Sequence, residues 1–209
     1  MLNRPLFLML AVILSVASAA AQQKGASADA QKKDAANTVP QKPEPGAAME
    51  RFSAPGPEHR ILEKRAGVWE VEYKYWSAPD AQPAISRGVS MFRMLLGGRY
   101  LEQDHEGELQ GMPYFGRGLA GFDRRNKKYV SLWLDTMSTG FNLTEGTCDA
   151  AGNVCAETGE MDDAAGGRKI KVRMVTTFQN ADTFVVEMFV TPPDGPEVRT
   201  MQDTYTRQK

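Results

Sequence analysis

The chain has 209 residues, and its 25 lysines and arginines nearly balance its 26 aspartates and glutamates, which gives a net charge of −1 at pH 7. This balance leaves no basic surface of the kind that binds nucleic acid or an anionic membrane, so the sequence predicts neither partner. The length suits one domain behind an N-terminal extension.

The N-terminus has the three parts of an export signal. Arg4 supplies a positive charge, residues 6–16 form an apolar run, and residues 17–21 are the small residues after which signal peptides are cleaved. The apolar run is too short to span a bilayer, which needs about 20 residues. We therefore predict a signal peptide at 1–21 and an exported protein, periplasmic or secreted, with no membrane insertion after cleavage.

Residues 22–57 are rich in Ala, Gln, Lys and Pro and contain almost no large apolar side chains. A segment of this composition cannot bury enough surface to order itself, so the sequence predicts a disordered tether. Residues 58–66 fit a short helix, and Gly67 stands where a helix commonly stops. The ordered domain is therefore expected at 58–209.

From Gly67 to Arg207 the sequence alternates in polarity, and no amphipathic helix interrupts it. In the first stretch, residues 69, 71, 73 and 75 are all apolar or aromatic and share one face. The later stretches cover 86–95, 99–106, 114–122, 129–137, 141–148, 155–160, 170–178, 184–190 and 198–207. This pattern predicts an all-β fold: a single antiparallel up-and-down β-barrel of about 8–10 strands, lipocalin-like, with the short helix at one end.

The two cysteines, Cys148 and Cys155, lie symmetrically about a Gly-Asn turn. Facing strand positions beside a tight turn are close enough to bridge, and an exported protein folds in an oxidising compartment. The sequence therefore predicts a disulfide between them. No further ligand is spaced to make the pair a metal site, and we expect neither a metal nor a cofactor.

Two groups of residues resemble known families. Gly67-x-Trp69 after a short helix, with Arg207 on the last strand, is similar to the start of a lipocalin-type barrel, in which the tryptophan closes one end and the arginine lies over it. A longer series of motifs resembles the bacterial domain-of-unknown-function family numbered fifteen-seventy-nine: Gly97–Glu102 (GGRYLE), Gly111–Tyr114 (GMPY), Gly121–Asp123 (GFD), Lys128–Ser131 (KYVS), Asp135–Met137 (DTM), Gly159–Asp163 (GEMDD) and Thr204–Arg207 (TYTR).

That family is grouped with the calycin (lipocalin-like) barrels and has no established activity. The resemblance spans about residues 58–209, so it implies the barrel fold for the whole ordered domain. The likeness to lipocalin-type barrels implies that Trp69 and Arg207 pack together at the barrel end. It supplies no catalytic residue.

If Trp69 points inward, counting along the strands gives the barrel interior an aromatic and aliphatic lining. Such a lining with few polar groups suits a small-molecule pocket, although a filled core shows the same pattern and the strand number decides between the two. The candidate ligand-binding residues are Tyr73, Tyr75, Phe141, Leu143, Glu145, Phe184, Val186 and Met188.

Carboxylates in phase with this lining are the candidates for chemistry. Glu145, Asp135 and Asp203 all fall on inward positions by this count. A buried carboxylate has a shifted pKa and could act as an acid or base, whereas at the rim it would pair with an arginine. Glu145 and Asp135 are therefore the catalytic candidates. The two histidines, His59 and His105, are expected at the surface.

The function that these patterns favour is binding of a small, largely apolar molecule inside the barrel. One alternative is a hydrolase or isomerase that uses an interior carboxylate, and another is a structural or protein-interaction module. The second alternative comes from Val130, Leu132 and Leu134, which make the outer face of their strand as apolar as the other face. Such a face would be covered by the N-terminal segment or by a second copy of the chain, as in a homodimer.

Overall fold

The computed structural model of the protein describes residues 45–162 and 167–209. The predicted signal peptide at 1–21 and residues 22–44 of the predicted tether lie outside this part of the chain. Among the described residues, no helix combines the length and the apolar character needed to cross a membrane.

The described residues form two short helices and ten strands. The helices are α1 (Pro45–Ser53) and α2 (His59–Glu63). The strands are β1 (Gly67–Tyr75), β2 (Ala84–Leu95), β3 (Tyr100–Leu109), β4 (Met112–Asp123), β5 (Lys128–Asp135), β6 (Asn142–Cys148), β7 (Val154–Asp162), β8 (Lys169–Asn180), β9 (Thr183–Thr191) and β10 (Val198–Arg207). Both helices precede the first strand, as the alternating polarity after residue 67 predicts.

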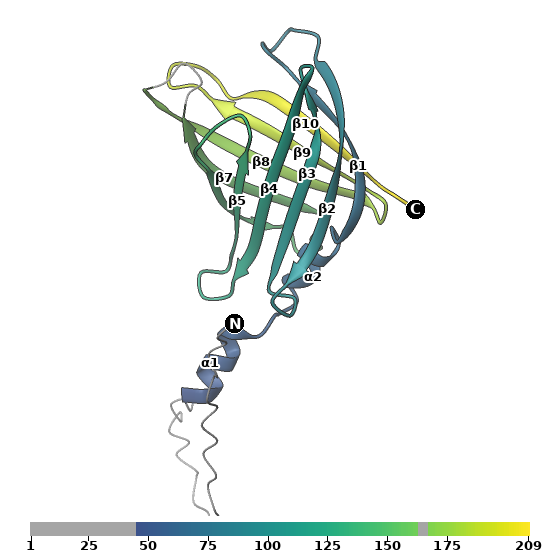
Figure 1. Ribbon diagram of the computed structural model, residues 1–209. Helices are drawn as coiled ribbons and strands as arrows, with labels where there is room; N and C mark the ends of the chain where they lie inside the picture. Colours follow the sequence, from purple (N-terminus) through teal and green to yellow (C-terminus); the bar gives the residue numbers. More distant parts are fainter. Residues whose placement is uncertain (1–44, 163–166) are drawn as a thin grey trace, which may run out of the picture. The chain divides into compact units, whose positions relative to one another are not determined.

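Each strand pairs antiparallel with the next along the chain, and β1 also pairs with β10, which closes the sheet into a barrel (Figure 1). The β1–β10 ladder runs from Trp69 opposite Arg207 to Tyr75 opposite Met201. Closure leaves no unpaired edge strand in the sheet. The predicted fold class is confirmed, and the strand number stands at the upper end of the predicted range.

Residues 45–53 differ from the expected disordered tether, because they form α1. The sequence PGAAMERFS places proline at the first helical position and then alanine, methionine and glutamate, which are strong helix formers. The helix is followed by two contacts with the barrel turns: Arg99 Nε donates to the carbonyl of Ser53, and Arg124 Nη1 donates to that of Ala54. The described side chains of α1 are exposed. Local propensity and these contacts, rather than an apolar face, account for the helix.

The short helix α2 closes one end of the barrel. Leu62 is fully buried in the core. The Tyr129 hydroxyl donates to the carbonyl of Glu58 at 3.0 Å, and Lys64 Nζ donates to the carbonyl of Gly152 at 2.8 Å. These contacts join α2 to β5 and to the β6–β7 turn, so the helix is fixed to the barrel on two sides.

Trp69 and Arg207 join the start of β1 to the end of β10. The Arg207 guanidinium carbon lies 4.0 Å from the centre of the Trp69 ring, and its Nη1 donates to the Ala66 carbonyl at 2.8 Å. Trp69 Nε1 donates to the Arg65 carbonyl at 2.7 Å. Gly67 has a φ of +127°, and a Cβ there would lie 2.6 Å from Arg207 Nη1, so this position requires glycine.

The predicted disulfide is present between Cys148 and Cys155, which are paired across the β6–β7 hairpin. Cys148 packs against the core near the α2 end. No cysteine in the described part of the chain is free. The bridge therefore fixes the hairpin next to the turn that contacts α2.

Two glycines leave room for a tyrosine hydroxyl inside the barrel. Gly88 and Gly107 pair directly, and a Cβ on either would overlap the hydroxyl of Tyr73. We expect Gly107→Ala to lower the free energy of unfolding by about 1–3 kcal/mol, because the methyl group would also meet the Arg87 carbonyl at 2.7 Å. Urea denaturation measures this loss. Gly140→Ala is the control, since a Cβ there meets nothing within 4 Å, and equal losses in both variants would contradict the packing.

Candidate ligand-binding site

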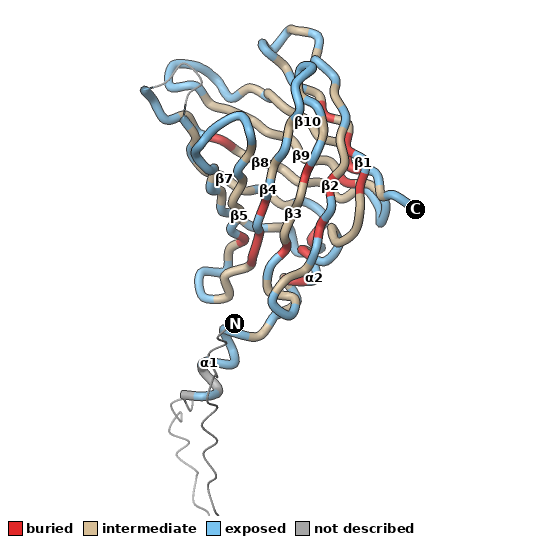
Figure 2. The backbone as a smooth tube through the Cα atoms, in the orientation of Figure 1, coloured by how far each residue is buried: buried red, intermediate tan, exposed pale blue. Residues whose placement is uncertain are grey.

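The strand register fixes which side chains face the barrel interior, here called the lumen. Alternate residues of each strand face inward, and the ladders carry that direction around the closed sheet. At the α2 end these side chains form a continuous core: Leu62, Trp69, Val71, Tyr73, Phe92, Leu101, Ala120, Tyr129, Phe184 and Tyr205. Figure 2 shows the buried positions mainly on β1–β4 and near α2. The lumen is filled at this end.

The packing ends about halfway along the barrel. On β1 the exposed fraction is 1% at Trp69, 2% at Val71 and 6% at Tyr73, and it rises to 37% at Tyr75. These four residues share one face of one strand, so the change follows position along the barrel axis. The lumen is therefore closed by side chains near α2 and less filled toward the opposite end, called the far end below.

The last two strands show the same change. Phe184 and Tyr205 are buried, whereas the next inward residues, Val186 and Asp203, are only partly buried, and so is Met188 after them. No residue of β6 or β7 is buried. Apart from Val172 of β8, which is 4% exposed, the inward-facing side chains beyond Asp203 keep accessible surface. The lumen from Asp203 to the far end is called the unfilled half.

One wall of the unfilled half is apolar. Met174 of β8 and Val186, Met188 and Val190 of β9 all face inward and are only partly buried. These strands lie across the barrel from β3 and β4. A molecule in the unfilled half would thus contact aliphatic and thioether groups on one side, which suits an apolar body.

The opposite wall carries a chain of hydrogen bonds whose direction can be worked out. The Tyr73 hydroxyl donates to the Arg87 carbonyl at 2.9 Å, so its oxygen accepts from His105 Nε2 at 3.3 Å. His105 Nδ1 then has no proton and accepts from the Ser90 hydroxyl at 2.7 Å. Gln103 Nε2 donates to Ser90 Oγ at 3.1 Å. The chain therefore holds His105 as the neutral tautomer with its proton on Nε2.

Burial lowers the pKa of His105 to about 4, so the ring carries no charge at pH 7. Both ring nitrogens are used in hydrogen bonds, which leaves no lone pair for a metal. The expected surface position of His105 is wrong, because its pairing with Ser90 places it inside. His59 is buried as well, and its Nδ1 accepts from the Gly56 amide at 2.9 Å.

Nearer the far end, Tyr114, Trp133 and Asp135 form a second polar group. Trp133 Nε1 donates to Asp135 Oδ2 at 2.9 Å, and the Tyr114 hydroxyl donates to the same oxygen at 3.3 Å. The Met137 amide donates to the other carboxylate oxygen. Burial raises the pKa of Tyr114, and the charges of Asp135 and Asp203 add to this shift, so the Tyr114 hydroxyl lies near both carboxylates. Asp135 is a hydrogen-bonded anchor for two aromatic rings, an arrangement that does not favour the hydrolase alternative.

Asp203 lies where the filled core gives way to the unfilled half. It pairs with Tyr73 on one side and Val186 on the other. Its Oδ1 is buried and has no hydrogen-bond partner, and among the described residues it forms no ion pair. Burial raises the pKa of Asp203 to about 7. This is an interior carboxylate whose hydrogen-bonding capacity the protein leaves unused.

Arg65 enters the interior from the α2 end. Its Nε is buried without a hydrogen-bond partner. Burial lowers the pKa of Arg65, and the charge of Glu157 on β7 opposes this shift most. The Thr144 hydroxyl donates to Glu157 Oε2 at 2.7 Å. Arg65 is thus electrostatically matched by a carboxylate on the neighbouring wall.

The predicted ligand-binding residues divide between the two faces of the barrel. Tyr73, Phe184, Val186 and Met188 face inward, and Tyr75 stands toward the far end. Phe184 belongs to the filled core rather than to the unfilled half.

Phe141, Leu143 and Glu145 face outward, so the prediction that they line the lumen is wrong. Gly146 pairs with the inward Tyr129, which puts the even-numbered residues of β6 inside. Phe141 and Leu143 are 64% and 50% exposed, and Glu145 forms an ion pair on the outer surface. Leu143 of β6 and Phe141 just before it therefore face solvent, whereas Asn142, Thr144 and Gly146 face the lumen. Glu145 is therefore excluded as an interior acid or base.

The outward residues of β4, β5 and β6 form an exposed apolar surface. Leu119 pairs with Leu132, and Leu132 pairs with Leu143, so three leucines stand in one row. Next to this row a groove of about 980 Å³ extends over β5–β8, and Val130, Phe141 and Leu143 are among the residues that line it.

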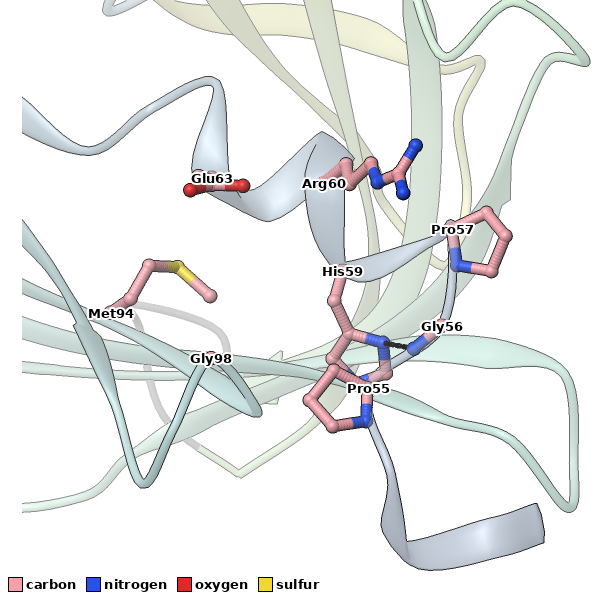
Figure 3. Close-up of a pocket in the computed structure, with 8 residues that line it drawn as sticks. All are labelled: Pro55, Gly56, Pro57, His59, Arg60, Glu63, Met94 and Gly98. Atoms are coloured by element: carbon pink, nitrogen blue, oxygen red, sulfur yellow. Dashed lines mark hydrogen bonds between the residues drawn. The ribbon is translucent and has the colours of Figure 1, made fainter.

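A smaller pocket of about 490 Å³ lies beside α2, outside the filled end of the barrel. It is lined by Pro55, Gly56, Pro57, His59, Arg60, Glu63, Met94 and Gly98 (Figure 3). The one hydrogen bond drawn among these residues joins His59 to the Gly56 amide. Within the described residues no group of three or more His, Cys, Asp or Glu could hold a metal ion.

The fold and its interior define a class of protein: closed, ten-stranded up-and-down β-barrels. The lumen is filled with side chains at one end, and at the other end it has one apolar and one polar wall. The family described as "Protein of unknown function (DUF1579)" matches residues 54–207, which include α2 and all ten strands. The chain belongs to this family, the one that its sequence motifs resemble. No curated protein matches the chain.

Three solved structures are similar to the chain. Rv2717c from M. tuberculosis has a TM-score of 0.53 and 14% sequence identity, over 75% of this chain and 100% of that one. A redesigned β-barrel, b11L5F_LGL, has a TM-score of 0.38 and 16% identity, over 72% and 96%. The protein EF1p2_mFAP2b bound to DFHBI has a TM-score of 0.39 and 15% identity, over 72% and 99%. The first likeness shows the fold alone, and the TM-scores of the other two are too low to carry an argument.

Proposed function

We propose that the protein binds a small, largely apolar molecule in the unfilled half of its lumen. The observation that carries the proposal is the change in packing along the barrel: the inward face is buried near α2, and beyond Asp203 it keeps accessible surface on every strand, with Val172 of β8 the one buried position there among the described residues. Apolar side chains that face an interior space without neighbours forgo the contacts that normally stabilise a core. An apolar ligand against Met174, Val186 and Met188 would supply those contacts.

Filling the lumen tests this proposal. Met188→Trp adds a large side chain on the inward face, and we expect it to weaken binding of the neutral dye phenylnaphthylamine by at least about tenfold, because the side chain occupies the ligand's space. Dye fluorescence in a titration measures the affinity.

The adjacent substitution Glu187→Trp is the matched control, since Glu187 faces outward and forms a surface ion pair with Arg199. Its effect on dye affinity should be less than about twofold. The proposal fails if the wild-type protein does not bind the dye, or if both tryptophan variants bind it as the wild type does.

We also propose that the protein is exported and that its barrel is of the calycin type. The disulfide supports an oxidising compartment such as the periplasm or the extracellular space. The sequence motifs that resemble the calycin-grouped family support the second statement. The row of Leu119, Leu132 and Leu143 supports the further proposal that a second copy of the chain covers the outer face, as in a homodimer.

A further inference from the structure

We propose that the lumen ligand carries a protonated amine on its apolar body, and that Asp203 is the carboxylate that binds this amine. The inference rests on the proposed function, because it names the chemical class of the molecule that occupies the unfilled half.

The first argument is the state of the Asp203 side chain. Its Oδ1 is buried, has no hydrogen-bond partner and lies in no ion pair among the described residues. A buried polar oxygen without a partner is unfavourable, and a buried carboxylate more so, which makes such a group a candidate for completion by a ligand. An ammonium group is the partner that a carboxylate binds most strongly.

The second argument is position. Asp203 pairs with Tyr73, the last buried residue of β1, and with Val186, the first inward residue of β9 that keeps accessible surface. It therefore lies at the floor of the unfilled half, where a ligand that enters from the far end would stop. From there the apolar wall of β8 and β9 continues toward the far end through Met188 and Val190.

The third argument is charge. The inward carboxylates are Asp135, Glu157 and Asp203, and the interior cation Arg65 is matched by Glu157. Burial raises the pKa of Asp203, and none of the ion pairs among the described residues includes Asp203. His105, on the facing wall, is neutral at pH 7. The unfilled half thus has an excess of negative charge, which favours a cationic head group over an anionic one.

The fourth argument is the ring faces around Asp203. Tyr73 is the cross-strand partner of Asp203. Burial raises the pKa values of Tyr73, Tyr114 and Tyr205, and the charge of Asp203 adds to each shift, so these three phenols lie near the carboxylate. The His105 ring, in turn, lies 5.5 Å from the Tyr73 ring and 6.3 Å from the Trp133 ring, centre to centre. Aromatic faces attract organic cations in addition to the carboxylate. A carboxylate among phenol rings therefore selects an amine over a neutral polar group.

The test compares three probes that share one apolar chain: decylamine, decanol and decanoate. Calorimetric titration at pH 8, where Asp203 is ionised, should show decylamine bound at least about tenfold more tightly than decanol or decanoate. Asp203→Asn should reduce the affinity for decylamine to that for decanol and leave the decanol affinity unchanged. Glu145→Gln, which removes a carboxylate from the outer surface, is the matched control and should bind all three as the wild type does.

The outcomes separate the two proposals. If none of the three probes binds, the proposed function fails. If decanol or decanoate binds as tightly as decylamine, or if the preference for decylamine survives in Asp203→Asn, lumen binding stands and the assignment of an amine to Asp203 is overturned. A preference for decanoate would overturn it in the same way. Asp203→Ser is the second variant, with the same expected loss, should Asp203→Asn not fold.

Discussion

Replacing Trp69 with alanine is expected to lower the free energy of unfolding by about 3–5 kcal/mol. The indole is 1% exposed and packs edge-on against Phe184, with ring centres 4.7 Å apart. Its other face lies under the Arg207 guanidinium, and its Nε1 binds the Arg65 carbonyl. Alanine would therefore leave a cavity in the filled end and remove the group that joins α2, β1 and β10.

Urea denaturation followed by circular dichroism measures the effect of Trp69→Ala. Trp76→Ala is the matched control, because Trp76 also carries an arginine over its ring, Arg199 at 4.5 Å, but lies after β1 at the far end and is only partly buried. The control should lose less than about 1 kcal/mol, which is typical of an exposed cation–π contact. A loss from Trp69→Ala no larger than that from Trp76→Ala would contradict a filled barrel end.

The second large effect concerns the pH dependence of stability, in which Asp203 and His105 act in opposite directions. Burial raises the pKa of Asp203 from 3.8 to about 7. Between these values the folded state keeps a proton that the unfolded state has lost, so stability falls as pH rises from about 4 to 7. Burial lowers the pKa of His105 from 6.5 to about 4. Between pH 4 and 6.5 the unfolded state binds a proton at His105 and the folded state does not, so stability rises with pH.

Between pH 4 and 6.5 the effects of Asp203 and His105 on the pH dependence of stability nearly cancel. Replacing one of the two residues should therefore make the effect of the other measurable. Relative to the wild type, Asp203→Asn should gain stability as pH rises, by about 3 kcal/mol over this interval, and His105→Gln should lose stability by a similar amount. Urea denaturation of the three proteins without ligand at several pH values measures this. Surface carboxylates contribute equally to all three, so the differences isolate the two interior groups. Differences from the wild type that do not change with pH would show that neither group titrates as described.

The barrel could be predicted from the sequence because its evidence is local and repeated. Strand β1 alternates strictly between aromatic or aliphatic residues and charged ones, so its inner face is unambiguous. The disulfide was predictable for the same reason, since Cys148 and Cys155 flank a single turn. Both depend on residues close together in the chain.

The binding site could be predicted only in part, because the inner face of later strands depends on register rather than on polarity. The apolar Leu143 of β6 and the preceding Phe141 face outward, and the inner face of β6 carries Thr144 and Gly146. The pairing of Gly146 with Tyr129, rather than any pattern in β6, decides the direction. Counting each hairpin register outward from Trp69 would have placed these residues correctly.

The sequence pattern also does not predict which polar residues face the interior, for a related reason. These residues are Ser90, Gln103, His105 and Tyr114. A polar side chain in a strand predicts that its face is exposed to solvent, because burying an unpaired polar group costs free energy. Hydrogen bonds between these side chains remove that cost and allow them to face the interior. One signal was available: the strand from 112 to 123 contains Gly116 and Gly118, which leave room for the Trp133 ring on the inner face. Glycines in register with a bulky residue of the next strand indicate that this residue lies over them on the same face of the sheet.

Native mass spectrometry of the protein isolated from its own host without refolding tests the central claim of a ligand-binding lumen most directly. We expect a reproducible adduct of small-molecule mass on the wild-type protein, retained in Glu187→Trp and absent in Met188→Trp, because only the second substitution fills the lumen. The bare protein mass in all three, together with no binding of the neutral dye, would contradict the claim.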